Sequence, residues 1–316
     1  MPTAAKDYEK KNRDLDAIFA YLPVKEIIFI GPAAVGDMVA ADAKTSANAD
    51  RIRYINENDI IPFDTIKKVF AERVAKEGYD IGSNSKLGWY YQQFLKMKFC
   101  ELSDEDYYLS WDADTIPLHK IDMFTDDDIP YFDIKTELMP GYFKTISSLL
   151  GMNKVCPKSF ISEHMIFSVD LMKDLIAFIE KTDFDGTYFY EKIIYAMGLD
   201  NLKRGFSEFE TYGTYVMTKY PDKYVYRDWR SLRFAAAFLD PMNLSEDDMR
   251  WLSESFEALS FENYHDFNPQ LFAMFRNPEF RSQLSSGEFY QILLEEGYFG
   301  RYADGGILTM EGLFPA

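Results

Sequence analysis

The sequence predicts an α/β protein in which a mostly parallel sheet is flanked by helices and followed by a helical C-terminal region. Two observations carry this prediction: apolar strand patterns alternate with amphipathic helix patterns over the first two thirds of the chain, and the last third is mostly helical in pattern. The 316 residues are 47% hydrophobic and 27% charged, which is enough for a large core and unlike a disordered chain. Helices between strands imply parallel crossovers and a sheet covered on both faces.

The first half of the chain supplies most of the expected strands. Apolar residues recur at helical spacing over residues 7–22, and Pro23 ends that pattern before a short apolar run at residues 26–30. The same reasoning gives strands at residues 51–55 and 107–111, and helices at residues 64–74 and 86–99.

The second half is expected to be richer in helix. It should contain a strand at residues 160–169, helices at residues 171–181 and 188–197, an edge strand at residues 258–262, and mostly helix over residues 268–297. Ser245 and Asp248 have the spacing of a capping box for a helix through residue 256. Because no Pro/Ser/Gly-rich linker interrupts the chain, we expect one large domain at residues 1–240 with a helical extension at residues 241–316 packed on it.

Composition excludes several functional classes. The apolar runs are too short to span a bilayer, and residues 1–11 lack a signal-peptide pattern. A net charge of -18 disfavours nucleic acid as a partner. Cys100 and Cys156 have neither metal-ligand spacing nor a disulfide framework, which favours buried thiols in a reducing compartment. We therefore expect a cytoplasmic protein with at most peripheral membrane association.

The segment with the strongest functional signal is residues 107–118, where a predicted strand runs into Asp112, Ala113 and Asp114. Ligands in α/β sheets bind at the carboxyl ends of strands. If the segment stays extended, the two carboxylates point to the same side about 7 Å apart, a span that one hydrated divalent cation can bridge. A bare D-x-D is often a solvated turn, but its position after a buried strand favours a site.

Two known families place a D-x-D after a strand. In haloacid-dehalogenase-like phosphatases the motif lies near the start of the fold, and Thr or Val stands where this chain has Ile116. The other family fits better, because four ordered blocks resemble a bacterial family of GT-A-type glycosyltransferases associated with surface polysaccharide synthesis. The blocks are GWYYQQFLK (88–96), YLSWDADTI (108–116), FISEHMIF (160–167) and FSEFETYG (206–213), and the resemblance covers residues 2–233.

The resemblance implies a metal site. The D-x-D would hold Mn²⁺ or Mg²⁺ against the diphosphate of a nucleotide sugar, with Asp114 as a direct ligand and Asp112 shared between the metal and the ribose. Many GT-A enzymes add a late histidine, for which His265 is the candidate here; a surface-loop histidine is an equally good interpretation. The net charge of -18 also favours a metal. A negative charge of the protein 4 Å from a negative charge of the diphosphate costs roughly 4 kcal/mol even at an effective dielectric of 20.

Further donor contacts are expected on the helix at residues 86–99 and in an arginine segment. Trp89, Gln92, Gln93 and Lys96 are the candidates on the helix, although adjacent glutamines diverge by about 100°, so at most one of the two faces the sheet. Arg230, within the segment that also carries Arg227 and Arg233, could bind phosphate as a bidentate fork. Ordinary packing and surface ion pairing are the alternatives.

Acceptor binding and catalysis are expected at two other blocks. His164 and Glu163 are candidate contacts to the donor or acceptor sugar, with a satisfied core histidine as the alternative. Glu208 and Glu210 are candidates for a catalytic base, and Glu210 is favoured because it is nearer to a helix expected to begin at Thr211. The alternative is a helix N-terminus that is simply rich in acids.

GT-A folds open with a strand before the first helix, whereas residues 1–5 resemble only the tail of such a strand. Either the start of the chain is truncated or this strand is very short. The nucleotide contacts expected near Thr3, Ala4 and Tyr8 depend on which of these holds.

The sequence thus predicts a metal-dependent glycosyltransferase that moves a sugar from a nucleoside-diphosphate sugar, above all a UDP-sugar, to a saccharide or lipid-linked acceptor. One alternative is a nucleotidyltransferase that forms sugar nucleotides, but its usual Gly-rich loop is missing, and Pro32 in the segment 31–36 removes a backbone donor. Another is a non-catalytic carbohydrate-binding protein, which could use the 22 tyrosines and 27 phenylalanines as stacking platforms.

Overall fold

The computed structural model describes residues 1–8, 14–44, 47–76, 86–136, 139–199, 202, 204–262 and 267–295. The strands are β1 (Ile27–Gly31), β2 (Ile52–Asn56), β3 (Tyr107–Trp111), β4 (Thr115–Pro117), β5 (Tyr131–Ile134), β6 (His164–Ser168), β7 (Val225–Asp228), β8 (Ser231–Leu232) and β9 (Ala258–Ser260). The helices are α1 (Ala5–Tyr8), α2 (Asp14–Tyr21), α3 (Ala33–Asp42), α4 (Glu57–Ile60), α5 (Phe63–Lys76), α6 (Leu87–Lys98), α7 (Pro140–Leu150), α8 (Val169–Glu180), α9 (Phe189–Ala196), α10 (Glu208–Lys219), α11 (Glu246–Ser253), α12 (Pro269–Phe275), α13 (Pro278–Gln283) and α14 (Ser286–Glu295).

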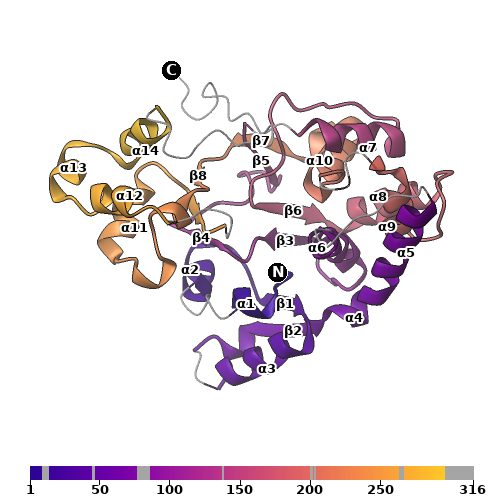
Figure 1. Cartoon of the computed structure of the whole chain (residues 1–316), viewed down its shortest axis with the longest axis horizontal. Helices are drawn as coiled ribbons and strands as arrows, with labels where there is room; N and C mark the ends of the chain where they lie inside the picture. Colours follow the sequence, from indigo (N-terminus) through magenta and orange to yellow (C-terminus); the bar gives the residue numbers. More distant parts are fainter. Residues whose placement is uncertain are drawn as a thin grey trace.

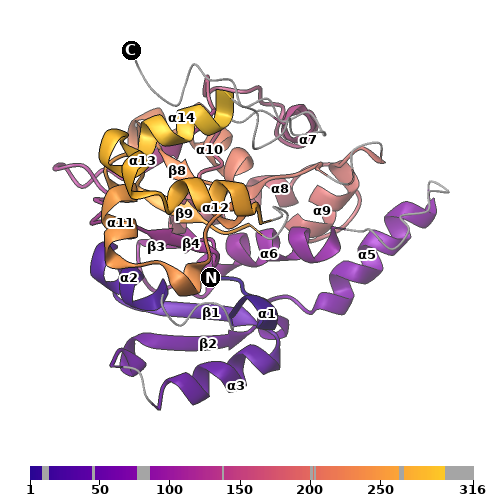
Figure 2. The same cartoon turned by 60° about the vertical axis from the view of Figure 1, so that its left-hand side comes forward.

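The expected α/β class and the helical C-terminal region are both present (Figures 1 and 2). The strands form four small sheets: β1 with β2, β3 with β6, β5 with β7, and β4–β9–β8. Three of the strand pairs are parallel, whereas β3 with β6 and β4 with β9 are antiparallel. The described strands are two to five residues long, so each ladder is short and the sheet expected from sequence is divided into small units.

The first residues of the chain lie beside β1. Pro2 forms a parallel bridge to Ile30, the backbone N–H of Thr3 donates to the Ile30 carbonyl at 2.8 Å, and the N–H of Ile30 donates to the Met1 carbonyl at 3.0 Å. This single bridge lies where the sequence resembles the tail of a first strand.

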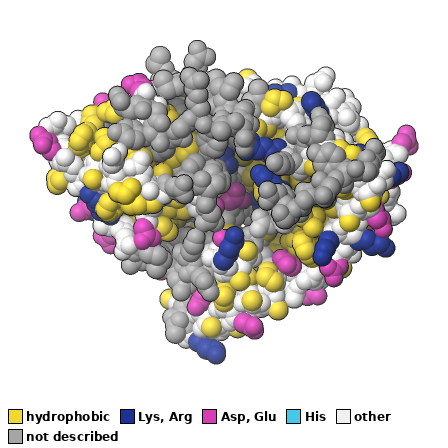
Figure 3. All heavy atoms as spheres, viewed as in Figure 1, with side chains coloured by type: hydrophobic (Ala, Val, Ile, Leu, Met, Phe, Trp, Pro, Cys, Tyr) yellow, Lys and Arg dark blue, Asp and Glu magenta, His cyan; other side chains and the backbone are white. Residues whose placement is uncertain are grey.

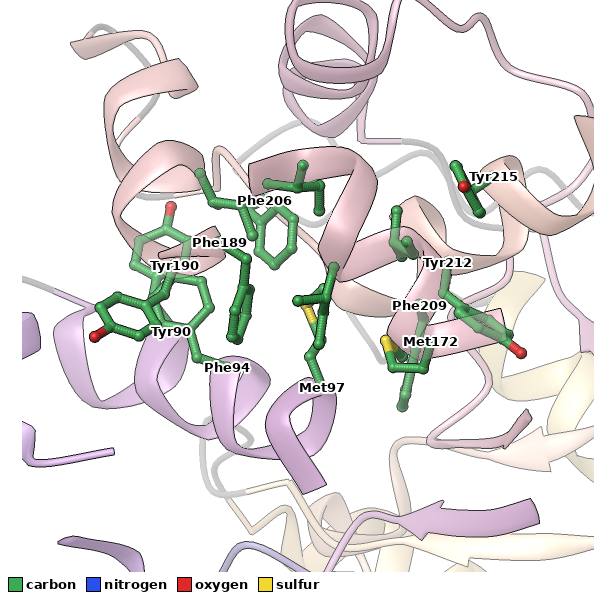
Figure 4. Close-up of a cluster of buried hydrophobic side chains, with 14 of the residues drawn as sticks. Tyr90, Phe94, Met97, Met172, Phe189, Tyr190, Phe206, Phe209, Tyr212 and Tyr215 are labelled. Carbon is green, nitrogen blue, oxygen red and sulfur yellow. The ribbon is translucent and has the colours of Figure 1, made fainter. Parts of the chain in front are cut away.

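The larger hydrophobic cluster lies between α6 and helices α8, α9 and α10, and Figure 4 shows part of it. Phe94 of α6 faces Phe189 and Phe206, with ring centroids 6.2 and 5.9 Å apart. On α10, Gly213 packs against the ring of Phe160 so closely that an added Cβ would lie 2.5 Å from it. A glycine is therefore required where α10 crosses that ring.

A second hydrophobic cluster joins the C-terminal helices to residues earlier in the chain. Side chains of α11, α12 and α14 pack on the segment 232–239 and on Ile116 and Leu118, in and just after β4. Figure 2 shows α11 to α14 lying together on one side of the molecule. The expected capping box is confirmed: Ser245 Oγ accepts from the backbone of Asp248, and the Asp248 carboxylate accepts from that of Ser245.

Within the described residues, no helix combines the length and apolar character that crossing a membrane requires.

Candidate active site

The D-x-D motif lies in a tight turn between β3 and β4. The backbone N–H of Thr115 donates to the Asp112 carbonyl at 3.1 Å, so the chain reverses here and the extended geometry expected for Asp112 and Asp114 is wrong. The three turn residues are half-buried, whereas Trp111 before them and Thr115 after them are buried. The indole Nε1–H of Trp111 donates to the Thr115 carbonyl at 2.7 Å and so closes the turn. The carboxylates are therefore presented from a fixed loop.

Two neighbouring segments hold this turn through backbone hydrogen bonds. The N–H of Asp112 donates to the Glu163 carbonyl, and the N–H of Phe261 donates to the Asp114 carbonyl, both at 2.8 Å. Because β6 runs antiparallel to β3, its first residue, His164, pairs with Trp111. This topology brings the predicted residues Glu163 and His164 beside the D-x-D.

Lys96 connects the D-x-D to the start of α10. Its ammonium lies 2.8 Å from Asp112 Oδ1 and 2.9 Å from Glu208 Oε1. Burial alone would lower the pKa of Lys96, but the two carboxylates outweigh it and hold that pKa above its ordinary value. Gln93, one turn earlier on α6, is buried and accepts a hydrogen bond from the backbone N–H of Glu208 at 3.1 Å. Three predicted site residues, Lys96, Asp112 and Glu208, are thus in direct contact, with Gln93 beside them.

The helix expected to begin at Thr211 in fact begins at Glu208, because the Ser207 side chain caps it by accepting from the N–H of Glu210. Both glutamates therefore lie in the first turn and point in different directions. Glu208 contacts Lys96, whereas Glu210 is 1% exposed and accepts a hydrogen bond from Ser159. Of the two carboxylates, that of Glu208 is the one held next to the D-x-D.

The carboxylate of Glu163 is fully engaged by protein groups. Lys135 donates to Oε1 at 2.7 Å, while Ser231 and Trp229 donate to Oε2 at 2.8 and 3.1 Å. Burial raises the pKa of Glu163, but Lys135 and Arg233 outweigh it and leave the pKa below its ordinary value. Glu163 also has a positive φ of 64°, a conformation that costs free energy in a non-glycine residue. These contacts keep Glu163 in that conformation.

His164 is equally enclosed. It is 2% exposed, Nε2 lies 2.8 Å from Asp133 Oδ2, and Nδ1 lies 2.9 Å from the Ser162 carbonyl. Arg227 donates to both carboxylate oxygens of Asp133, at 2.6 and 2.7 Å. Burial would raise the pKa of Asp133, but the hydrogen bonds from Arg227 and His164 hold it below its ordinary value. Both ring nitrogens of His164 are committed to protein acceptors.

Glu262 is an acidic residue at this site that sequence reasoning did not select. It follows Phe261, whose backbone contacts Asp114, and its carboxylate pairs with Arg233. Burial raises the pKa of Glu262 to about 7; Arg233 opposes this shift, while Asp114 and Glu163 add to it. The sequence signal for it is an acid at the end of the expected edge strand, residues 258–262, three residues before His265.

The remaining predicted residues are more dispersed. Trp89 is half-buried and packs against Tyr90 and Tyr142, and Gln92 is half-buried, in contrast to the buried Gln93. Arg230 pairs with Glu257 at 3.8 Å and is 44% exposed, so it is held by a different element from Gln93. His265 lies outside the described residues.

On the face shown in Figure 3, basic and acidic side chains lie next to one another near the middle of the molecule, where Figure 1 has β3 and β6.

Among the residues with described positions, no three or more His, Cys, Asp or Glu side chains are grouped as a metal site. The donor set nevertheless suits Mn²⁺ or Mg²⁺, since these ions take carboxylate oxygens and are commonly held by one or two carboxylates together with substrate phosphates. Asp112 and Asp114, half-buried at a strand end, fit that pattern.

Fold and site describe an α/β protein with acidic and basic groups concentrated at the carboxyl end of β3. Residues 21–278 match the model of a family of unknown function (DUF6492), and the chain belongs to that family. No curated protein matches the chain. Among solved structures, the apo form of mouse xyloside xylosyltransferase 1 is similar at 14% identity and a TM-score of 0.43, over 85% of this chain and 98% of that one.

Proposed function

We propose that this protein is a metal-dependent glycosyltransferase of the GT-A type, which transfers a sugar from a nucleoside-diphosphate sugar to a saccharide or lipid-linked acceptor. The observation that carries the proposal is the solvent-accessible D-x-D turn at the end of β3, with Lys96 and Glu208 held directly beside it. A UDP-sugar is the proposed donor, and surface polysaccharide synthesis the proposed setting, from the sequence resemblance.

Asp112 and Asp114 are the residues that would hold Mn²⁺ or Mg²⁺. When bound, the ion would supply the positive charge that a diphosphate leaving group needs in a protein of net charge -18. Lys96 lies at hydrogen-bond distance from Asp112, so it orients that carboxylate and adds a fixed positive charge at the same place. His265 remains a proposed third ligand from the sequence.

Glu208 is the carboxylate best placed to act on the acceptor. An inverting transfer needs a base within about 3 Å of the acceptor hydroxyl, and Glu208 shares Lys96 with the D-x-D. Glu210, which the sequence favoured, contacts Ser159 from within the core.

The proposed location is the cytoplasm, which the two buried, free cysteines favour.

A thermal-shift screen tests the proposal. Nucleoside diphosphates and sugar nucleotides are added to the protein with and without Mn²⁺, and a ligand at 100 times its Kd should stabilise the protein by about 2.7 kcal/mol. We expect a shift with a uridine nucleotide that requires Mn²⁺. If no nucleotide produces a metal-dependent shift, the proposal is wrong. A shift with saccharides alone would favour a non-catalytic binding protein.

A further inference from the structure

Trp111 joins the two ends of the D-x-D turn. It is 3% exposed, and its Nε1–H donates to the carbonyl of Thr115, on the far side of the turn, at 2.7 Å. An indole nitrogen can only donate, so this bond fixes the direction of the Thr115 carbonyl. The position of the Trp111 ring therefore sets the path of the backbone that carries Asp112 and Asp114.

The Trp111 ring rests on His164. Their ring centroids are 5.0 Å apart with an interplanar angle of 32°, and the two residues are opposite each other in the β3–β6 ladder. His164 also contacts Trp229, with centroids 4.4 Å apart in an edge-to-face arrangement. The histidine thus touches two indole rings, and one of them closes the turn.

The contacts of His164 hold its ring in place. Nδ1 lies 2.9 Å from the Ser162 carbonyl, and Nε2 lies 2.8 Å from Asp133, whose two carboxylate oxygens also accept hydrogen bonds from Arg227. Because both ring nitrogens have a protein partner, the ring is kept against Trp111.

We propose that His164, held between Asp133 and the Ser162 carbonyl, positions the D-x-D turn through Trp111. His164 and Trp111 are positioning residues: they touch the turn, or each other, and not the substrate. The consequence for ligand binding rests on the proposed function of the turn, whereas the geometry of the turn does not.

A histidine variant tests the link from His164 to the turn. His164→Phe keeps a ring beside Trp111 but loses the contacts to Asp133 and the Ser162 carbonyl, and His119→Phe, at a side chain that is 41% exposed, is the control. We expect only His164→Phe to accelerate amide hydrogen exchange at Asp112 and Thr115. Equal exchange in the two variants would overturn the inference.

A matched pair of tryptophan variants tests the positioning. Trp111→Phe keeps a ring but removes the bond to Thr115, and Trp251→Phe removes the same type of bond, to the Leu284 carbonyl at 3.2 Å, in the cluster formed by the C-terminal helices. We expect Trp111→Phe alone to accelerate amide hydrogen exchange at Asp112 and Thr115. It should also weaken Mn²⁺-dependent UDP binding by about 10- to 100-fold, as loss of a residue that orients metal ligands does.

The outcomes separate this inference from the proposed function. If the parent protein binds no nucleotide with Mn²⁺, the proposed function fails, but amide exchange still decides the positioning role. If Trp111→Phe leaves exchange at Asp112 and Thr115 the same as in Trp251→Phe, the positioning role is wrong even if the parent binds UDP and Mn²⁺.

Discussion

The ammonium of Lys96 lies 2.9 Å from Oε1 of Glu208, and the two side chains are only 10% and 5% exposed. This pair joins the C-terminal half of α6 to the first residue of α10. Since Lys96 also contacts Asp112, its charge serves both the packing of two helices and the D-x-D turn. Replacing Lys96 should therefore lower the stability of the fold and also weaken ligand binding.

Lys96→Met should destabilise the protein by about 3–5 kcal/mol, because it leaves Glu208 buried without its cation. Urea unfolding measures the free energy. Lys68→Met is the matched control: its 3.9 Å pair with Glu72 is exposed, so its loss should cost less than about 1 kcal/mol. Equal, small effects of both changes would show that the Lys96 pair does not stabilise the fold.

Asp114→Asn should weaken Mn²⁺-dependent UDP binding sharply while leaving the melting temperature of the free protein nearly unchanged, because the side chain keeps its shape but loses the charge that a hard cation prefers. Isothermal titration with UDP, with and without Mn²⁺, measures the effect. Asp104→Asn, at an exposed position, serves as the control. Parent-like binding by Asp114→Asn would make the D-x-D an ordinary turn.

Glu208→Gln should lower sugar transfer by about 10²- to 10⁴-fold if Glu208 is the base, with donor binding largely retained. Glu210→Gln should have a smaller effect, since Glu210 contacts Ser159 and not the D-x-D side. Transfer rates of both variants and the anomeric configuration of the product check this. A product that retains the donor configuration, or a larger loss in Glu210→Gln, would remove the base role from Glu208.

Asp133 should make the protein sensitive to acid. Its pKa is held below the ordinary value by Arg227 and His164, so its stabilising contribution is complete above about pH 4, the ordinary Asp pKa, and is lost as pH falls towards the lower pKa of the folded state. Asp133→Asn should be less stable at neutral pH, and its free energy of unfolding should fall less steeply than that of the parent below about pH 4. Urea unfolding at several pH values measures this. If the free energies of parent and variant fall equally with pH, the prediction is wrong.

Gln93→Ala and Arg230→Ala should behave differently, although the sequence grouped these residues in one donor pocket. Gln93 is buried and accepts the first N–H of α10, so its loss should cost about 1–3 kcal/mol of stability. The partly exposed Arg230 pairs with Glu257 at 3.8 Å, so its loss should cost less than about 1 kcal/mol. Thermal unfolding distinguishes the two, and donor KM then shows whether either residue contacts the nucleotide sugar.

The elements that the sequence predicted best are those with strong local periodicity. The strand over residues 107–111 was predicted at its observed bounds, and the helix over residues 86–99 within one residue at each end. The early start of α10 was also signalled locally, since Ser207 and Glu210 have the spacing of a cap.

The parts that could not be predicted depend on contacts between distant residues. The strand expected over residues 160–169 begins only at His164, because Glu163 adopts a positive φ held by Lys135, Ser231 and Trp229. Nothing in the local sequence indicates this, since Glu163 is not a glycine. Asp133, Lys135 and Glu262 likewise show their importance only when the fold brings their partners to them.

The D-x-D turn lies in the chain between two hydrophobic clusters. Before the turn, Trp111 packs in a cluster with Phe29 and Ile166; after it, Ile116 packs with the C-terminal helices. A ligand bound by both Asp112 and Asp114 would be lost when either side opens. Such a ligand would couple the opening of one cluster to that of the other and so raise the cooperativity of unfolding.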